Sequence, residues 1–248
     1  MMRFRSWAVS HPGAVRDHNE DAFVDRPDIG LWAVADGAGG HKSGELASAM
    51  IKQALERIPA GLSGSDMVAK VRAAIADTHD ALLQEAARRG PQIMIASTVA
   101  VLLAHGDHYA CLWAGDSRIY LLRDGELLQL TRDHSLVQEM VDAGVVRPED
   151  AEHHPRANVI TRAIGADGDD LELEKLTDRI IAGDRFLLCS DGLFKALHAL
   201  DVAALLDPLE PLPADALVEA AVRAHATDNV TAVAVEALAD SGGQAEAP

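Results

Sequence analysis

Helix-like and strand-like segments come in blocks along this chain rather than in regular alternation. Apolar residues follow a three-to-four spacing after Ser43 and again after Ser65, which predicts two consecutive helices, each capped by its serine. Short apolar runs separated by turn residues follow, and Asp124-Gly125 is the stronger of their two hairpin signals. The expected strands of this meander are residues 93–104, 107–114, 118–123 and 126–130.

The C-terminal half returns to helices and then to strands. Ser135 to Gln138 has the pattern of a capping box, which predicts a helix that stops near Gly144. Residues 145–165, rich in Pro, His, Arg and Asp, are expected to form an irregular surface segment. Tight turns between strands favour antiparallel sheets, and paired helices between strand blocks favour the α+β class, with helices outside the sheets. The last expected elements are a strand at 185–190, two helices within 199–226 and a strand at 230–236.

The chain is expected to form one domain over residues 1–238, because no repeat and no linker interrupts the pattern. Its 248 residues suffice to bury a sizeable core. Residues 239–248 are small and polar, and we expect them to be a disordered tail.

The net charge of −17 excludes some classes of partner. Nucleic-acid binders neutralise phosphates with Lys and Arg, whereas this chain has 39 acidic and 22 basic residues. The N-terminus lacks the apolar stretch of a signal peptide, and the longest apolar run, Ile93 to Ala104, is shorter than the ~20 residues that span a bilayer. Cys111 and Cys189 lie inside apolar runs, as free thiols do in a reducing compartment. These features predict a cytoplasmic monomer that binds no nucleic acid and has no membrane anchor.

Four aspartates lie at the edges of apolar, strand-like runs. Asp36, Asp116 and Asp191 each follow such a run and precede a small residue, and Asp228 stands just before another run. Burying an unpaired carboxylate is costly. Several carboxylates at one end of a sheet would repel each other unless a cation held them. The repetition therefore predicts a site for a hard metal ion with oxygen ligands.

Two further motifs have ordinary interpretations when taken alone. Residues 16–21, Arg-Asp-His-Asn-Glu-Asp, could be a surface cluster of salt bridges. Residues 36–41, Asp-Gly-Ala-Gly-Gly-His, could be a simple turn. The second motif lacks the Lys-Ser/Thr ending of a nucleotide-binding loop. Its glycines would instead let the backbone approach a metal, with the Gly37 carbonyl as a ligand.

Taken in order, the motifs resemble those of the metal-dependent serine/threonine phosphatases of the protein phosphatase 2C family, particularly the short bacterial members. The resemblance runs from about Val9 to Val235. It implies a four-layer α/β/β/α sandwich, with two central antiparallel sheets flanked by helix pairs. That architecture agrees with the α+β class, although the segment pattern alone does not specify four layers. Besides the two motifs above, the resemblance rests on Gly115-Asp116-Ser117-Arg118, Thr131-Arg132-Asp133-His134, Cys189-Ser190-Asp191-Gly192 and Asp228-Asn229.

The resemblance also implies roles for the strand-edge aspartates. Asp36 would bridge two divalent cations, Mn²⁺ or Mg²⁺. Asp191 and Asp228 would complete the protein ligands of the first cation. Asp116, together with Asp191, would support a third and weaker metal site, as in bacterial relatives.

The remaining roles fall on the earlier segment. The second cation would take the Gly37 carbonyl and the pair Glu20 and Asp21, directly or through water. Arg16 would hold the substrate phosphate, which its planar fork of donors suits better than a lysine would. Two cations ~3.5–4 Å apart would activate a bridging water for in-line attack, so that no protein nucleophile is required.

The chain departs from the family pattern at several positions. Eukaryotic relatives have a histidine, thought to be a general acid, where this chain has Ala38. His41 is given no role, and protonation of the leaving group by metal-bound water is the simpler hypothesis. Ala96 stands where the family usually has glycine, a mild change in packing. Residues 145–165 match the variable flap of the family, which either selects substrates or is only a mobile loop.

The resulting hypothesis is a phosphoprotein phosphatase that acts on phosphoserine and phosphothreonine, opposing a bacterial serine/threonine kinase. One alternative is a catalytically silent module of the same fold that binds phosphoproteins, although such proteins normally lack metal ligands that this chain retains. Another is a phosphatase of small phosphomonoesters, which the acidic surface neither supports nor excludes. The sequence does not specify the substrate, the kinase, the pathway or the choice between Mn²⁺ and Mg²⁺.

Overall fold

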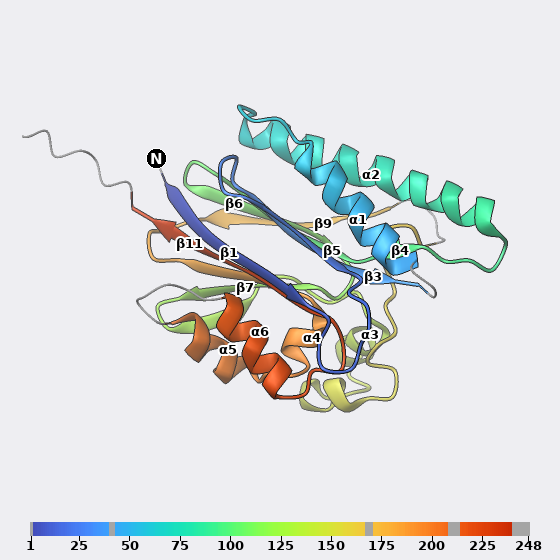
Figure 1. The fold of residues 1–248 in the computed structure, drawn as a ribbon. Coiled ribbons are helices and arrows are strands. Elements are labelled where there is room, and N and C mark those ends of the chain that lie inside the picture. Colours follow the sequence, from blue (N-terminus) through green and yellow to red (C-terminus); the bar gives the residue numbers. More distant parts are fainter. Residues whose placement is uncertain (1, 40–42, 167–170, 208–213, 240–248) are drawn as a thin grey trace, which may run out of the picture.

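Two antiparallel sheets pack face to face, and helices cover the outer face of each (Figure 1). This computed structural model describes residues 2–39, 43–166, 171–207 and 214–239, so His41 and nearly all of the expected tail lie outside the described residues. The four-layer α+β sandwich expected from the family resemblance is confirmed. The first sheet has the order β1 (Arg3–His11), β11 (Val230–Leu238), β10 (Arg185–Cys189), β7 (Arg118–Arg123) and β8 (Glu126–Gln129).

The second sheet carries the longer helix pair. The helices α1 (Ser43–Glu56) and α2 (Gly64–Arg89) lie over this sheet, whereas α5 (Ala199–Leu206) and α6 (Ala214–Arg223) lie on the first sheet (Figure 1). Two short helices, α3 (Leu136–Asp142) and α4 (Asp191–Phe194), and the 3-10 helix η1 (Pro148–His153) complete the helical elements of the described residues. The second sheet has the order β2 (Asp21–Arg26), β3 (Leu31–Ala38), β5 (Val99–His105), β6 (His108–Ala114) and β9 (Glu174–Arg179), and the short β4 (Ala96–Ser97) pairs with β3.

Strand β3 shows why its sequence is apolar without interruption. Alternate side chains of a strand point to opposite faces of a sheet, and both faces of β3 are covered. Leu31 and Ala33 pack into the core beneath α1 and α2. Trp32 and Val34 pack into the core between the two sheets. A strand buried on both faces cannot alternate apolar with polar residues, and here the first polar residue is Asp36, near the end of the strand.

The structure corrects several expected element boundaries. Ser63 caps α2, where its hydroxyl accepts a hydrogen bond from the Asp66 N–H, so the expected cap at Ser65 is wrong. The strand expected at 93–104 is divided into β4 and β5 at Thr98. Strands β1, β2 and β9 were not expected. The helix expected to stop near Gly144 ends at Asp142. Residues 145–165 are irregular, as expected, apart from η1 and two isolated bridges, one from Ile164 to Ser97 of β4 and one from Ile160 to Ser135.

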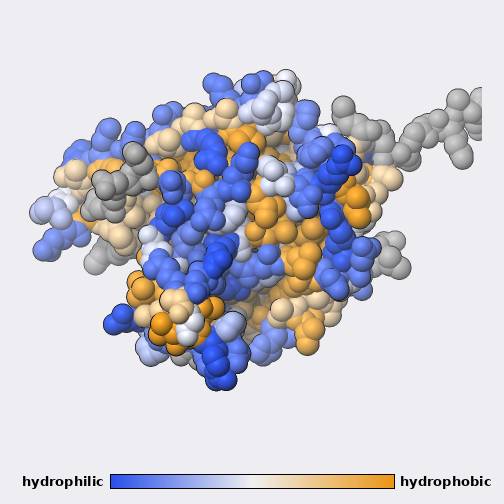
Figure 2. Space-filling model, turned by 180° about the vertical axis from the view of Figure 1, so that it is seen from behind, coloured by the Kyte–Doolittle hydropathy of each residue, from blue (hydrophilic) through white to orange (hydrophobic). Residues whose placement is uncertain are grey.

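The face of the molecule that is turned away from the viewer in Figure 1 is mainly polar. Seen from behind, hydrophilic residues dominate, and hydrophobic residues gather in a band between them (Figure 2). Among the described residues, no helix is both long enough and apolar enough to cross a membrane.

Candidate metal centre

One end of the sandwich gathers the strand-edge acids from both sheets. Asp21 opens β2 and stands directly opposite Asp36 of β3 in the antiparallel register. Asp191 follows β10 by two residues and begins α4, and Asp228 precedes β11 by two residues. Asp116 lies in the connection from β6 to β7, which passes from one sheet to the other. The strand-edge pattern therefore describes a real spatial cluster.

An open cleft of about 870 Å³ lies at this end of the sandwich. Of the eight predicted site residues, six line this cleft, and the other two, Asp21 and Asp116, lie beside it. Asp21 is held beneath the cleft, and Asp116 lines a small adjoining cavity with Arg118 and Lys195. The six predicted residues that line the cleft itself are Arg16, Glu20, Asp36, Gly37, Asp191 and Asp228.

The carboxyl groups of the cluster resist ionisation, because they are buried and lie close to one another. Burial, more than any neighbouring charge, raises the pKa of Asp36 well above its usual value, and Asp21 and Asp191 raise it further. Burial likewise raises the pKa of Asp21 and of Asp116 to about 7. Burial is also the main cause of the raised pKa of Glu20. A bound cation would reverse these shifts, because it favours the ionised form of every carboxyl group around it.

Unpartnered oxygens indicate where such a cation fits. Asp21 Oδ1, Asp116 Oδ1 and Asp191 Oδ1 are buried, and each lacks a hydrogen-bond donor among the described residues. An unpartnered buried carboxylate oxygen is costly unless a cation binds it. Within the described parts of the chain, no three acidic, His or Cys side chains already surround one ion position, and two of the aspartates turn to side-chain cations instead. The oxygen donors themselves suit Mg²⁺ or Mn²⁺.

Two buried hydroxyl groups hold Asp21 in place. Ser190 Oγ donates to Asp21 Oδ2 over 2.7 Å, and Thr231 Oγ1 donates to the same oxygen over 2.6 Å. These bonds join the first sheet to the second at the acidic end. They also leave the other oxygen, Oδ1, without a donor. Sequence reasoning gave neither Ser190 nor Thr231 this role, because a hydroxyl 169 or 210 positions away gives no local signal.

Asn229 joins the N-terminal motif to β11. Its Oδ1 accepts from the Glu20 N–H over 2.8 Å, and its Nδ2 donates to the carbonyls of Pro12 and His18. The residues before β2 are thereby fixed beside Asp228. The Asp-Asn dipeptide was the sequence signal, although only its aspartate was given a role.

Gly37 occupies a position where no other residue fits. A Cβ on Gly37 would lie 2.2 Å from the Gly44 carbonyl oxygen and 2.6 Å from the Glu20 carbonyl oxygen. The Gly37 N–H donates to that same Glu20 oxygen over 3.2 Å. The backbones of residues 16–21, residues 36–41 and the start of α1 therefore pack closely at this point, where Gly37 lines the cleft.

Two basic side chains face the acids. Arg16 donates through one nitrogen to Asp228 Oδ2 over 3.0 Å, and more than half of the Arg16 side chain remains exposed. Lys195, which sequence reasoning missed, forms an ion pair with Asp191 Oδ2. Both cations lie where carboxylates gather, and Arg16 keeps donors free toward the cleft.

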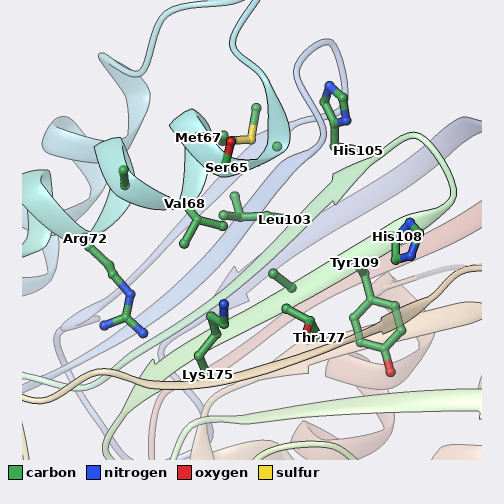
Figure 3. Close-up of a pocket in the computed structure, with 13 residues that line it drawn as sticks. Ser65, Met67, Val68, Arg72, Leu103, His105, His108, Tyr109, Lys175 and Thr177 are labelled. Carbon is green, nitrogen blue, oxygen red and sulfur yellow. The ribbon is translucent and has the colours of Figure 1, made fainter.

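A second cavity, of about 580 Å³, lies between α2 and strands β5, β6 and β9. Figure 3 shows the residues that line it. Met67, Val68 and Leu103 contribute apolar walls, and Arg72 and Lys175 contribute positive charge. None of the described residues that line it is acidic. A hard metal ion would have no carboxylate there, so the acidic cleft is the candidate for metal chemistry.

Comparison with known protein families gives an independent result. The family model for protein phosphatase 2C matches residues 14–225. The serine/threonine protein phosphatase PstP of Mycobacterium tuberculosis is 37% identical over 240 residues, which are 96% of this chain and 46% of PstP, so the chain spans about half the length of that relative. The serine/threonine phosphatase stp of Listeria monocytogenes is 31% identical over 233 residues, which are 90% of this chain and 92% of stp.

Solved structures give the same result for the fold. PppA of Pseudomonas aeruginosa, described as a key regulatory component of T6SS, superposes with a TM-score of 0.88 at 42% identity, covering 95% of this chain and 98% of PppA. The catalytic domain of PstP, solved in complex with two manganese ions, superposes with a TM-score of 0.82 at 35% identity, covering 96% of this chain and all of that chain.

Proposed function

This chain belongs to the protein phosphatase 2C family, and we propose that it is a metal-dependent phosphatase that removes phosphate from phosphoserine and phosphothreonine in proteins. The observation that carries the proposal is the open cleft where strand-end carboxylates and the Gly37 backbone gather beside a half-exposed arginine. Carboxylates repel a phosphate dianion unless cations lie between them, so such a cleft suits metal-assisted hydrolysis. The relatives PstP and stp both carry the name serine/threonine phosphatase, which supports the substrate class.

We propose that two divalent cations, Mn²⁺ or Mg²⁺, bind in the cleft. The unpartnered carboxylate oxygens support the binding of cations, and the catalytic domain of PstP, solved with two manganese ions, supports the number two. When bound, such a pair supplies an activated water and neutralises the phosphoryl oxygens for in-line attack. The proposed ligands are Asp36 as the bridge, Asp191 and Asp228 for the first cation, and the Gly37 carbonyl with Glu20 and Asp21 for the second.

Asp21 would act through water rather than directly. Its Oδ2 already accepts hydrogen bonds from Ser190 and Thr231, and the carboxyl group lies beneath the cleft and is not among the residues that line it. Glu20 lines the cleft itself and can reach a cation directly. Glu20 would therefore be a direct ligand of the second cation, and Asp21 would contact that cation through a water molecule.

Arg16 would bind the substrate phosphate. Its guanidinium group uses one nitrogen on Asp228 and keeps the rest of its fork exposed at the cleft. A planar guanidinium can donate two parallel hydrogen bonds to phosphate oxygens, which fixes the orientation of the phosphorus relative to the metal site. Arg16 therefore both attracts the dianion and orients it.

The side chains near the cleft support attack by water rather than by a protein nucleophile. Burial raises the pKa of Cys189 to about 12 and raises the pKa of Cys111 as well, so both remain protonated thiols. Ser190 is fully buried and donates to Asp21, so its oxygen cannot reach a substrate. Ala38 lines the cleft but carries no proton to give to the leaving group.

We further propose that residues 1–238 form one catalytic domain in a cytoplasmic monomer that opposes a bacterial serine/threonine kinase. The continuous cores on both sides of each sheet support a single domain. The phosphatase family supports a role in signal transduction, because a protein phosphatase needs a kinase to supply its substrate. A kinase that phosphorylates the substrates of this enzyme is therefore its expected counterpart.

The experiment is hydrolysis of a phosphothreonine peptide in Mn²⁺, with and without chelator. Asp36→Asn should lower kcat/KM by more than about 100-fold, beyond the ~10–100-fold typical of residues that only support metal ligands. Asp80→Asn, on the exposed face of α2, is the matched control and should behave as the wild type. Activity that survives both chelation and Asp36→Asn would reject the proposal. A higher kcat/KM for small phosphomonoesters than for phosphopeptides would favour the alternative substrate class, and Mn²⁺ binding without hydrolysis would favour the silent binding module.

A further inference from the structure

Lys195 places a positive charge inside the acidic cluster. It directly follows α4, four residues after Asp191, and its ammonium group binds Asp191 Oδ2. On its other side the same ammonium donates to Asn158 Oδ1 over 2.7 Å. Only about 31% of the side chain is exposed. The ammonium is therefore held between a proposed metal ligand and the 145–165 segment.

The corner that receives this charge is otherwise uncompensated. Asp116 is 4% exposed, and Asp116 Oδ1 and Asp191 Oδ1 both lack a donor among the described residues. Burial raises the pKa of Asp116 and the Asp191 charge raises it further, whereas the Lys195 charge lowers it. The Lys195 charge also acts favourably on Asp36. One ammonium thus serves several carboxylates of the cluster at once.

The other basic residue of this corner is already used. Arg118 pairs with Asp133, with hydrogen bonds from both Nε and Nη2. Its guanidinium also stacks on Phe194, 3.6 Å from the ring centroid. Arg118 and Lys195 are the basic members of the small cavity that Asp116 lines. Lys195 is therefore the cation available to Asp116 and Asp191 among the described residues of that cavity.

We propose that Lys195 is a positioning residue whose ammonium occupies the cation position between Asp116 and Asp191, so that the centre binds two divalent cations and no third. The inference rests on the proposed function and refines its metal content. A third divalent cation between Asp116 and Asp191 would have to compete with the ammonium for the same two carboxylates, and the positive charge of Lys195 would repel it. Lys195 also holds Asp191 Oδ2 on one side, which leaves Oδ1 as the oxygen that faces a bound ion.

An ordinary helical ion pair would have different consequences. A lysine four residues after an aspartate on an exposed helix stabilises it slightly, with no effect on metal content. The position proposed for Lys195 instead predicts that removing its positive charge creates a third metal site. Metal stoichiometry therefore separates the two interpretations, whereas thermal stability alone would not.

The test counts Mn²⁺ bound per chain by equilibrium dialysis, with electron paramagnetic resonance of the bound ion. The wild type should bind two Mn²⁺. Lys195→Met, which keeps the length and removes the charge, should bind a third and weaker Mn²⁺, and Asp116→Asn in that background should abolish it. Lys195→Arg should restore the count of two, and Lys70→Met on the exposed face of α2 is the matched control. Lys195→Gln provides a second uncharged variant, and thermal unfolding in chelator confirms that each variant is folded.

Two results would overturn the inference. One is a wild type that already binds three Mn²⁺ and loses one on Asp116→Asn. The other is a folded Lys195→Met or Lys195→Gln that still binds two. The proposed function is measured separately, by phosphopeptide hydrolysis of the wild type. Two bound Mn²⁺ without hydrolysis would reject the function and leave the Lys195 assignment standing, whereas hydrolysis with three bound ions would do the opposite.

Discussion

Without its metal ions, the protein should lose stability as the pH rises from 5 to 8. Asp21 and Asp116 each have a pKa of about 7 in the folded chain, against an ordinary value of 3.8. A carboxyl group whose pKa is raised on folding binds more protons in the folded state than in the unfolded state. The free energy of unfolding therefore falls with rising pH, beginning near the unfolded pKa and ending near the folded one.

The magnitude follows from the two pKa values. One pKa unit corresponds to about 1.4 kcal/mol, and for one site moved from 3.8 to about 7 the part of the change between pH 5 and pH 8 is about 2 to 3 kcal/mol. Asp21 and Asp116 both interact with Asp191, so their contributions do not simply add. His134 acts in the opposite direction, because burial lowers its pKa and its neutral form is favoured on folding. The net expectation is a loss of a few kcal/mol, which is large beside the ~5–15 kcal/mol that typically stabilises a domain.

The assay is urea unfolding in chelator at several values between pH 5 and pH 8, followed by circular dichroism. Asp116→Asn cannot titrate, so it should flatten the pH dependence and stabilise the metal-free protein at pH 8. Asp80→Asn is the control for the loss of one surface charge. Saturating Mn²⁺ should remove the pH dependence of the wild type. A stability that stays constant or rises from pH 5 to pH 8 in chelator would refute the reasoning.

Two other substitutions test the cleft. Gly37→Ala should destabilise the protein by about 1 to 3 kcal/mol, because its Cβ would lie 2.2 Å from the Gly44 carbonyl oxygen. Gly64→Ala, where the nearest atom would be 3.4 Å from the new Cβ, is the control. Equal urea unfolding midpoints for the two variants would contradict the expectation. Arg16→Ala should lower kcat/KM for a phosphopeptide by about 10- to 100-fold through the loss of charged hydrogen bonds to phosphate, with partial recovery in Arg16→Lys. The Mn²⁺ affinity of Arg16→Ala should not weaken, since Asp228 loses a cation that competes with the metal. A weaker Mn²⁺ affinity alongside the lower kcat/KM would show that Arg16 instead supports the metal ligands.

The segment pattern predicted the α+β class and the family resemblance predicted the layers, whereas the ends of the elements were predicted less well. Apolar runs and hairpin signals identified β5 to β8, but the break at Thr98 comes from distant partners. The Thr98 hydroxyl accepts from the Asp36 N–H and bonds the Ser117 hydroxyl. Strand β9 is mostly exposed, so it lacks the apolar run that marks a buried strand. Such features depend on contacts between distant residues, which local periodicity does not contain.

The residues of the candidate site also fall into those that the local sequence pattern reveals and those that only the fold reveals. Acids and glycines at strand ends were visible in the sequence, because an aspartate at the edge of an apolar run recurs four times along the chain. The residues that hold them, such as Thr231, Asn229 and Lys195, were not visible. Each is an ordinary residue for its local segment, and it gains its role only through a partner such as Asp21 or Asn158 in the folded chain.

The position of β11 has a consequence for how the protein is made. This strand lies between β1 and β10 and pairs with β1 along nine residues, and Asn229 just before it fixes the segment that carries Arg16 and Glu20. The ribosome therefore synthesises Arg16 and Glu20 more than 200 residues before β11, the strand beside which they are fixed. Until that strand emerges, the nascent chain has no assembled pocket for metal or phosphate. Assembly of the proposed site therefore waits until β11 has been synthesised.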